Sequence, residues 1–179
     1  MATIPNPKTW VANEKPTAAG LNLEIRDALN FLLNPPQCSA YRSGALSAAN
    51  NTQVLVPLDA EVFDTDVMHD LSTNPSRMIA KTAGKYLVTA GVTFPSNATG
   101  VRGLVVEKNA AGVQGGGMII GQDQLTIVGI GSAVLSVATQ VVLAANDYLE
   151  IFVRQTSGAA LAVTPGERLT FIEMLWVGI

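Results

Sequence analysis

The sequence has one cysteine, Cys38, and one histidine, His69. A single cysteine excludes an intrachain disulfide, and we expect Cys38 to be a small buried side chain. One cysteine and one histidine also cannot supply a tetrahedral zinc site within one chain. A catalytic triad would have to use His69, but no strand–serine–helix elbow accompanies it, and we expect His69 to lie exposed in a loop. We therefore expect a protein that is not an enzyme and holds no cofactor or metal.

Charge is scarce as well. Only 14% of the residues are charged, against about 25% in an average protein, whereas 48% are hydrophobic. The net charge of −3 comes without a cluster of basic residues, which argues against binding to nucleic acid. A monomer so poor in charge covers its own surface with difficulty. We expect it to associate with copies of itself or with a larger particle; a weakly charged monomer is the alternative.

Long apolar runs are also missing. No stretch of about 18 apolar residues occurs, so no membrane span is expected. Residues 1–5 lack the basic and apolar regions of a signal peptide. The protein is therefore expected to be made and assembled in a cytoplasm.

Four acidic residues lie close together in the sequence, at Glu61, Asp64, Asp66 and Asp70. Paired carboxylates of this kind can serve a glycosidase or bind calcium. Their spacing matches neither an EF-hand loop nor another metal motif, so we expect solvated loop charges. The glycine-rich segments at 112–121 and 129–131 lack the Lys-Ser/Thr of a P-loop and are expected to be flexible hairpin loops.

Residues 1–16 contain three prolines, which favour an extended arm over a helix. Trp10 and Val11 lie within this arm, and a disordered tail seldom carries a tryptophan. We expect the arm to dock, either onto a partner or back onto its own domain.

Residues 17–35 have the features of an amphipathic helix. Thr17 is a suitable N-cap, and Asn34, Pro35 and Pro36 end the helical pattern. Apolar residues follow helical spacing at Leu21, Ile25, Ala28, Leu29 and Leu32. The helix either contacts other copies or a particle, or it lies on its own domain. We assign particle attachment to Trp10, Val11, Leu21, Ile25, Leu29 and Leu32.

From residue 38 onward, helical periodicity gives way to short strands separated by turn residues, the pattern of an antiparallel sandwich. No helical segment interrupts them, which argues against a parallel sheet. The expected strands are 38–43, 53–57, 60–64, 77–81, 84–94, 101–108, 118–121, 124–130, 133–142, 147–155 and 168–177.

The segment 84–94 alternates with a period of two, so its side chains fall on two faces. The face that begins with Tyr86 is suited to a core. The opposite face is small and half-polar, which suits a packed sheet surface or a subunit contact. The segment 147–155 alternates in a similar way. We assign to the core Tyr86, Val88, Val92, Phe94, Leu149, Ile151 and Val153.

The segment 168–177 is apolar on both faces, so both faces must be covered. In a two-layer sandwich only one face meets the core, and the other meets a neighbouring subunit or a loop. One face carries Leu169, Phe171, Glu173, Leu175 and Val177. We assign the opposite face, as a trimer interface, to Ile172, Met174 and Trp176.

Four segments resemble the jelly rolls of the tumour necrosis factor and complement globular-head family, and one of them is the closing strand 169–177, which resembles the family's final strand. Residues 84–88, Gly-Lys-Tyr-Leu-Val, followed by Phe94, are similar to its G-x-Y-x-V…F strand, and Phe63-Asp64 resembles its short strand ending in Phe-Asp. Residues 141–151 resemble its v-x-L-x-x-G-D-x-v-x-v turn and strand. Asn146 replaces the usual glycine, and asparagine tolerates the same left-handed backbone. The resemblance covers residues 38–179 and implies a compact homotrimer with the final strand near the three-fold contact.

The front end carries a second resemblance. Residues 9–33 are similar to the start of many small tail and other virion proteins of phages that infect actinobacteria, which reads T-W-x-x-G-x-x-x-T-A-x-x-L-N-x-x-I-R-D. Asn13 replaces the usual glycine. Together the two resemblances imply a docking arm at 1–16, an attachment helix at 17–35 and a jelly roll at 38–179.

The expected function is that of a non-enzymatic, homotrimeric minor tail or fibre protein located in the virion. One alternative is a capsid decoration or head fibre protein. Another is a receptor-binding module whose loops 65–75, 95–100 and 109–117 hold a host surface glycan.

Overall fold

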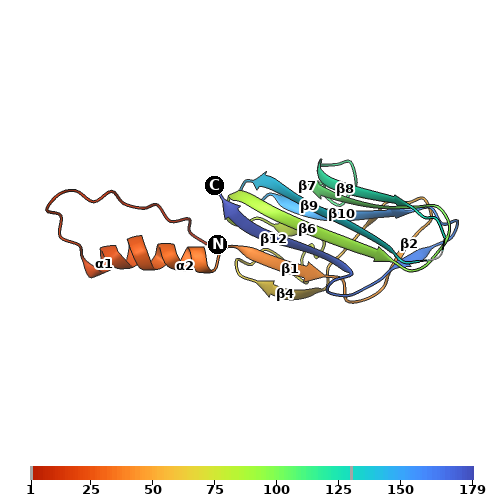
Figure 1. Ribbon diagram of the computed structural model, residues 1–179, viewed down its shortest axis with the longest axis horizontal. Coiled ribbons are helices and arrows are strands. Elements are labelled where there is room, and N and C mark those ends of the chain that lie inside the picture. Colours follow the sequence, from red (N-terminus) through yellow and green to blue (C-terminus); the bar gives the residue numbers. More distant parts are fainter. Residues whose placement is uncertain (1, 130) are drawn as a thin grey trace.

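The computed structural model of the chain describes residues 2–129 and 131–179. A helical stalk extends from one end of two packed β-sheets (Figure 1). Residue 1 of the predicted arm 1–16 and residue 130 of the predicted strand 124–130 lie outside the described residues.

The elements follow one another in the order helix, then strands. The stalk contains α1 (Ala18–Leu21), a π-helical turn η1 (Asn22–Arg26) and α2 (Asp27–Leu33). The strands are β1 (Gln37–Tyr41), β2 (Leu46–Ala48), β3 (Val54–Leu55), β4 (Ala60–Asp64), β5 (Met78–Ile79), β6 (Gly84–Phe94), β7 (Val101–Lys108), β8 (Met118–Thr126), β9 (Ala133–Leu143), β10 (Tyr148–Gln155), β11 (Leu161–Val163) and β12 (Thr170–Gly178).

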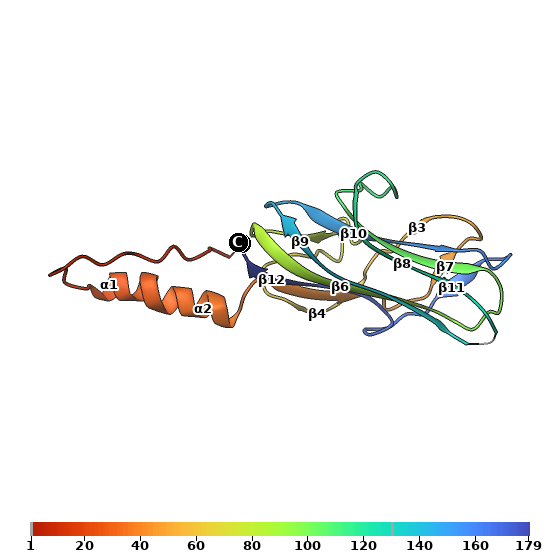
Figure 2. The ribbon, with the colours of Figure 1, turned by 45° about the horizontal axis from the view of Figure 1, so that its top comes forward.

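The strands form two antiparallel sheets that lie face to face (Figure 2). The first sheet has the order β4-β1-β12-β6-β9. The second has the order β3-β10-β7-β8, and β5 also pairs with β10. A third, two-stranded sheet consists of β2 and β11. Hydrophobic spacing misses β2 and β11, and it splits β8 in two at the polar residues Gln122 and Asp123. The bulge in the pairing of β8 with β7 lies earlier in the strand, at Ile120.

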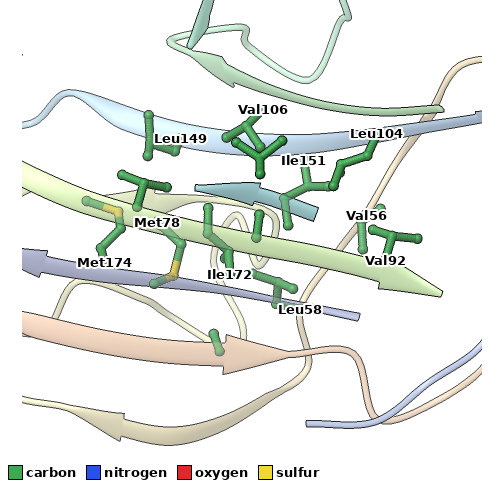
Figure 3. Packing of buried hydrophobic residues seen from close by; sticks show 14 of the residues in the cluster. Val56, Leu58, Met78, Val92, Leu104, Val106, Leu149, Ile151, Ile172 and Met174 are labelled. Atoms are coloured by element: carbon green, nitrogen blue, oxygen red, sulfur yellow. The ribbon is translucent and has the colours of Figure 1, made fainter. Parts of the chain in front are cut away.

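The core lies between the inner faces of the two sheets (Figure 3). Alternation along β6 turns Tyr86, Val88, Val92 and Phe94 inward, and all four are fully buried. Leu149, Ile151 and Val153 of β10 meet them from the second sheet. Cys38 is also fully buried, and burial raises the pKa of its thiol.

The assignment of Ile172 and Met174 to a subunit contact needs correction. Both side chains are buried within a single chain, and Figure 3 shows them pointing into the core. The cause is the register of β12 on β6: Ile172 lies opposite Ala90 and Met174 opposite Val88, so they share the inward face of β6. The outward face of β12 is therefore the one that carries Phe171, Glu173, Leu175 and Val177.

The loop that follows β4 also differs from expectation. His69 is only 4% exposed, not a solvated loop residue, and its ring bridges Glu61 Oε1 at 2.8 Å and the Pro75 carbonyl at 3.0 Å. Asp64 accepts hydrogen bonds from the backbone of Asp66 and His69. The acidic residues Glu61, Asp64 and Asp66 therefore fasten this loop, whereas Asp70 remains exposed.

Candidate assembly interface

The helix of the stalk forms where capping and spacing predict it. The Thr17 side chain accepts a hydrogen bond from Gly20 N at 3.1 Å, as an N-cap does, and the helix ends before Asn34. Apart from Phe31, its large apolar side chains are exposed, and Leu32 is 68% exposed. They project from more than one side of the helix: Leu21, Leu23, Ile25, Leu29, Leu32 and Leu33.

The arm leaves the sandwich, turns at the far end of the stalk and meets the helix there (Figure 1). Ala2 N donates to Asp66 of the sandwich, and Lys8 N donates to Glu24 of the helix at 2.7 Å. Asn13 takes φ 66°, a left-handed conformation that glycine adopts at no steric cost, which accounts for glycine at this position in the pattern. Trp10 and Val11 stay exposed although the arm folds back on its own chain.

One aromatic contact joins the stalk to the sandwich. Phe31 is 7% exposed, and its ring meets Trp176 edge to face with centroids 4.9 Å apart. The Trp176 indole donates to the Ala83 carbonyl at 3.1 Å. Trp176, the third residue assigned to the trimer interface, therefore packs against the stalk of its own chain.

The outer face of the first sheet carries both apolar and polar side chains. Residues directly opposite one another in antiparallel strands share a face of the sheet. The cross-strand partners of the outward residues Leu175, Leu87 and Glu173 therefore also lie on this surface. One row contains Phe63, Ser39, Glu173, Thr89 and Ala138, and the next contains Gln37, Leu175, Leu87 and Gln140. We call this surface the outer face of the first sheet.

Three details characterise this outer face. The Phe171 ring lies over Gly91, where an added Cβ would approach ring carbon Cε1 to 2.5 Å, so glycine is required there. A hollow of about 170 Å³ is lined in part by Phe63, Leu87 and Leu175. The carboxylate of Glu173 accepts from Ser39 Oγ at 3.1 Å and from Arg168 at 2.8 Å, so its charge is paired. The face therefore combines this hollow, which we call the socket, with uncharged polar side chains and one paired charge.

The second sheet contains two buried carboxylates that lie next to one another, and the sequence did not predict that they would meet. Glu107 and Glu150 lie opposite one another on β7 and β10, and both are buried on the outer side of the sheet. The loop 109–117 covers them: Gly115 N donates to Glu107 at 2.8 Å and Gly112 N donates to Glu150 at 2.8 Å. The segment 112–121, which includes part of this loop, was expected to be flexible, but the backbone of Gly112 and Gly115 is fixed to the two carboxylates. Their outward positions in alternating strands were the only signal in the sequence.

Two of the three loops considered for a glycan lie at opposite ends of the sandwich. Loop 65–75 begins beside Gln37 near the stalk, where Thr65 N donates to the Gln37 carbonyl at 2.9 Å. Loop 95–100 follows the opposite end of β6, an 11-residue strand that spans roughly 35 Å. One ligand therefore cannot bridge these two loops.

Two features were sought among the described residues: a cluster of metal-ligating side chains and a helix that could span a membrane. Among them, no group of three or more His, Cys, Asp or Glu side chains could hold a metal ion. Within the same part of the chain, no helix is both long and apolar enough to cross a membrane.

No family model matches the sequence, and no curated protein matches it. Solved structures do match the fold. Murine APRIL at pH 8.0 matches with a TM-score of 0.61 and 14% identity over 79% of this chain and 98% of that one. Eiger TNF from S. frugiperda gives 0.55 and 16% over 80% and 94%. The globular domain of zebrafish complement 1qA protein gives 0.53 and 16% over 80% and 99%.

These similarities confirm the predicted fold class, a mainly β antiparallel jelly roll of the tumour necrosis factor and complement type. The turn at Asn146 agrees in detail with the sequence pattern, since this residue takes φ 74° where glycine was expected.

Proposed function

We propose that this chain is a non-enzymatic structural protein that assembles as a homotrimer and attaches to a larger particle through its stalk. The jelly roll is displayed away from that particle. The resemblance to trimeric jelly rolls supports the assembly, and the outer face of the first sheet supplies for it a surface with an apolar socket and a paired charge.

The single observation that carries the proposal is the stalk. Six large apolar side chains are exposed on a 16-residue helix: Leu21, Leu23, Ile25, Leu29, Leu32 and Leu33. Burying side chains of this size contributes about 1.5–3 kcal/mol each, so leaving them in water forgoes a large stabilisation. A helix of this length is also marginal without tertiary contacts. Other copies of the stalk, or a particle surface, would supply these contacts.

We further propose that the particle is a bacteriophage virion, assembled in the host cytoplasm. The support is the similarity of residues 9–33 to the attachment segments of actinobacteriophage virion proteins. A minor tail or fibre protein is the preferred assignment, and a capsid decoration or head fibre protein is the alternative.

The assembly is tested by measuring the mass of the purified chain by light scattering. We expect the mass of three chains. Leu87→Glu places a charge beside the socket of the outer face and should give monomers. Val128→Glu places the same charge at a side chain that is 94% exposed and should leave the trimer intact. A stable wild-type monomer would contradict the proposal.

Attachment is tested by deleting residues 1–35. The remaining jelly roll should fold but should no longer enter particles, and immunogold labelling of wild-type particles should distinguish head from tail. Incorporation of the truncated chain would contradict the role of the stalk.

A further inference from the structure

A polar hollow lies on the outer side of the second sheet. It measures about 300 Å³ and is lined by Gln53, Gly103, Leu104, Val105, Gln114, Gln122, Asp123, Gln124 and Arg154. This volume is at the small end of the range of about 300–1,000 Å³ for ligand sites. The loop fixed by Glu107 and Glu150 contributes Gln114, so part of the wall is held rigidly.

The hollow exists because glycine occupies the middle of β7. Gly103 lies directly opposite Arg154 of β10 and Gln124 of β8, so a side chain is missing between two long polar ones. An added Cβ would find its nearest heavy atom, the Arg154 carbonyl oxygen, 3.9 Å away. Packing therefore does not require glycine here, in contrast to Gly91 beneath Phe171. A strand glycine of this kind often marks a site where a ligand approaches the backbone.

The lining is rich in amides and balanced in charge. Four glutamines surround the hollow, and each amide can both donate and accept hydrogen bonds, as sugar hydroxyls do. The Oε1 atom of Gln114 is buried without a hydrogen-bond partner within the described part of the chain. Such an atom gains a partner when a ligand hydroxyl donates to it.

The two charged residues of the lining are opposite in sign, and each already has a partner. Arg154 donates to Asn51, and Asp123 accepts from Ser136 N at 2.9 Å. The hollow therefore carries no surplus charge, which favours a neutral ligand over an anionic one.

We propose that this hollow binds one neutral sugar unit of a surface glycan, held by the glutamine amides over Gly103. The inference rests on the proposed trimer, because three weak sites linked in one particle bind a polysaccharide far more strongly than one. A trimer that forms through the outer face of the first sheet leaves the hollow open, because the outer faces of the two sheets lie on opposite sides of the sandwich.

The experiment applies labelled full-length protein to an array of neutral and anionic bacterial surface glycans, with saturation-transfer NMR to monosaccharides of the glycans that bind. The wild type should bind neutral glycans. Gly103→Leu should fill the hollow and reduce the array signal about tenfold or more. Gly131→Leu is the matched control and should bind as the wild type does, because among the described residues other than its chain neighbours no heavy atom lies within 4 Å of an added Cβ there.

A second variant, Gln114→Ala, removes the unpartnered Oε1 atom without filling the hollow and should also weaken binding. Full binding by Gly103→Leu would overturn the site, as would a preference for anionic glycans or the absence of any glycan bound by the wild type. Light scattering of each sample reports the trimer separately. A failure of sugar binding by an intact trimer therefore contradicts only this inference, whereas a monomer contradicts the proposed function.

Discussion

The sandwich and the stalk bury their apolar residues to very different degrees. In the sandwich, side chains from both sheets form one continuous core, and residues such as Phe94 and Leu135 are fully buried. In the stalk helix, Phe31 is the only residue of the described part that is classed as buried. The two regions nevertheless have similarly apolar side chains. The sandwich therefore buries its hydrophobic pattern within one chain, whereas the stalk leaves most of its apolar side chains exposed, which is the basis of the proposed attachment.

The largest expected effect is in the core of the sandwich. Phe94→Ala should lower the free energy of unfolding by about 3–5 kcal/mol, because the side chain is fully buried and its removal leaves a cavity. Denaturant unfolding measures this loss. Val128→Ala, at an exposed position, should change stability by less than about 0.5 kcal/mol. A loss below about 1 kcal/mol for Phe94→Ala would mean that the core is loosely packed there.

A smaller effect is expected where the sandwich fixes its own loop. Glu107→Ala should cost about 1–3 kcal/mol, because Gly115 N and Gly117 N lose their acceptor in a buried setting. Hydrogen exchange should also increase in loop 109–117. Glu167→Ala removes an exposed carboxylate and is the control. Unchanged exchange in the loop would show that the carboxylate does not fix it.

The contact between the two regions sharpens the comparison. Phe31→Ala removes the edge-to-face contact with Trp176 and should release the stalk while the sandwich stays folded. Circular dichroism should show a loss of helical signal, and the free energy of unfolding of the sandwich should change by less than about 1 kcal/mol. Leu32→Ala, at an exposed side chain of the same helix, should keep the helical signal. A large loss of sandwich stability in Phe31→Ala would mean that the regions fold as one unit.

Much of the sandwich could be predicted from the sequence, because burial on one face leaves an alternation that can be read directly. Tyr86 and Phe94 were assigned to the core on this basis. The orientation of β12 could not be predicted in this way. Both of its faces are apolar, and only its register on β6 decides that Ile172 and Met174 point inward.

Features made by residues distant in the sequence were also beyond prediction. Glu107 and Glu150 meet only after β7 pairs with β10, and a loop then covers them. The hollow over Gly103 depends on Arg154 and Gln124 from two neighbouring strands. No local pattern records either arrangement, because pairing between strands determines it.

The smallest expected effect is on the pH dependence of stability. It is tested by substituting two exposed aspartates, one in each region. Asp70 of the sandwich accepts hydrogen bonds from Thr73 N, Ser72 N and the Ser72 hydroxyl, and these lower its pKa to about 2. An aspartate in the unfolded chain has a pKa of about 3.9. Since the folded state binds this proton less readily, the contribution of Asp70 is fully present above about pH 4 and is lost as the pH falls towards 2.

Stability measured between pH 5 and pH 2 should therefore fall less steeply in Asp70→Asn than in the wild type. Asp27→Asn, on the stalk, should leave that slope unchanged, because the free energy measured is that of the sandwich and the stalk contributes little to it. An equal reduction of the slope by both substitutions would mean that acid acts on the chain as a whole. The sandwich and the stalk would then not differ in how their carboxylates contribute to stability at low pH.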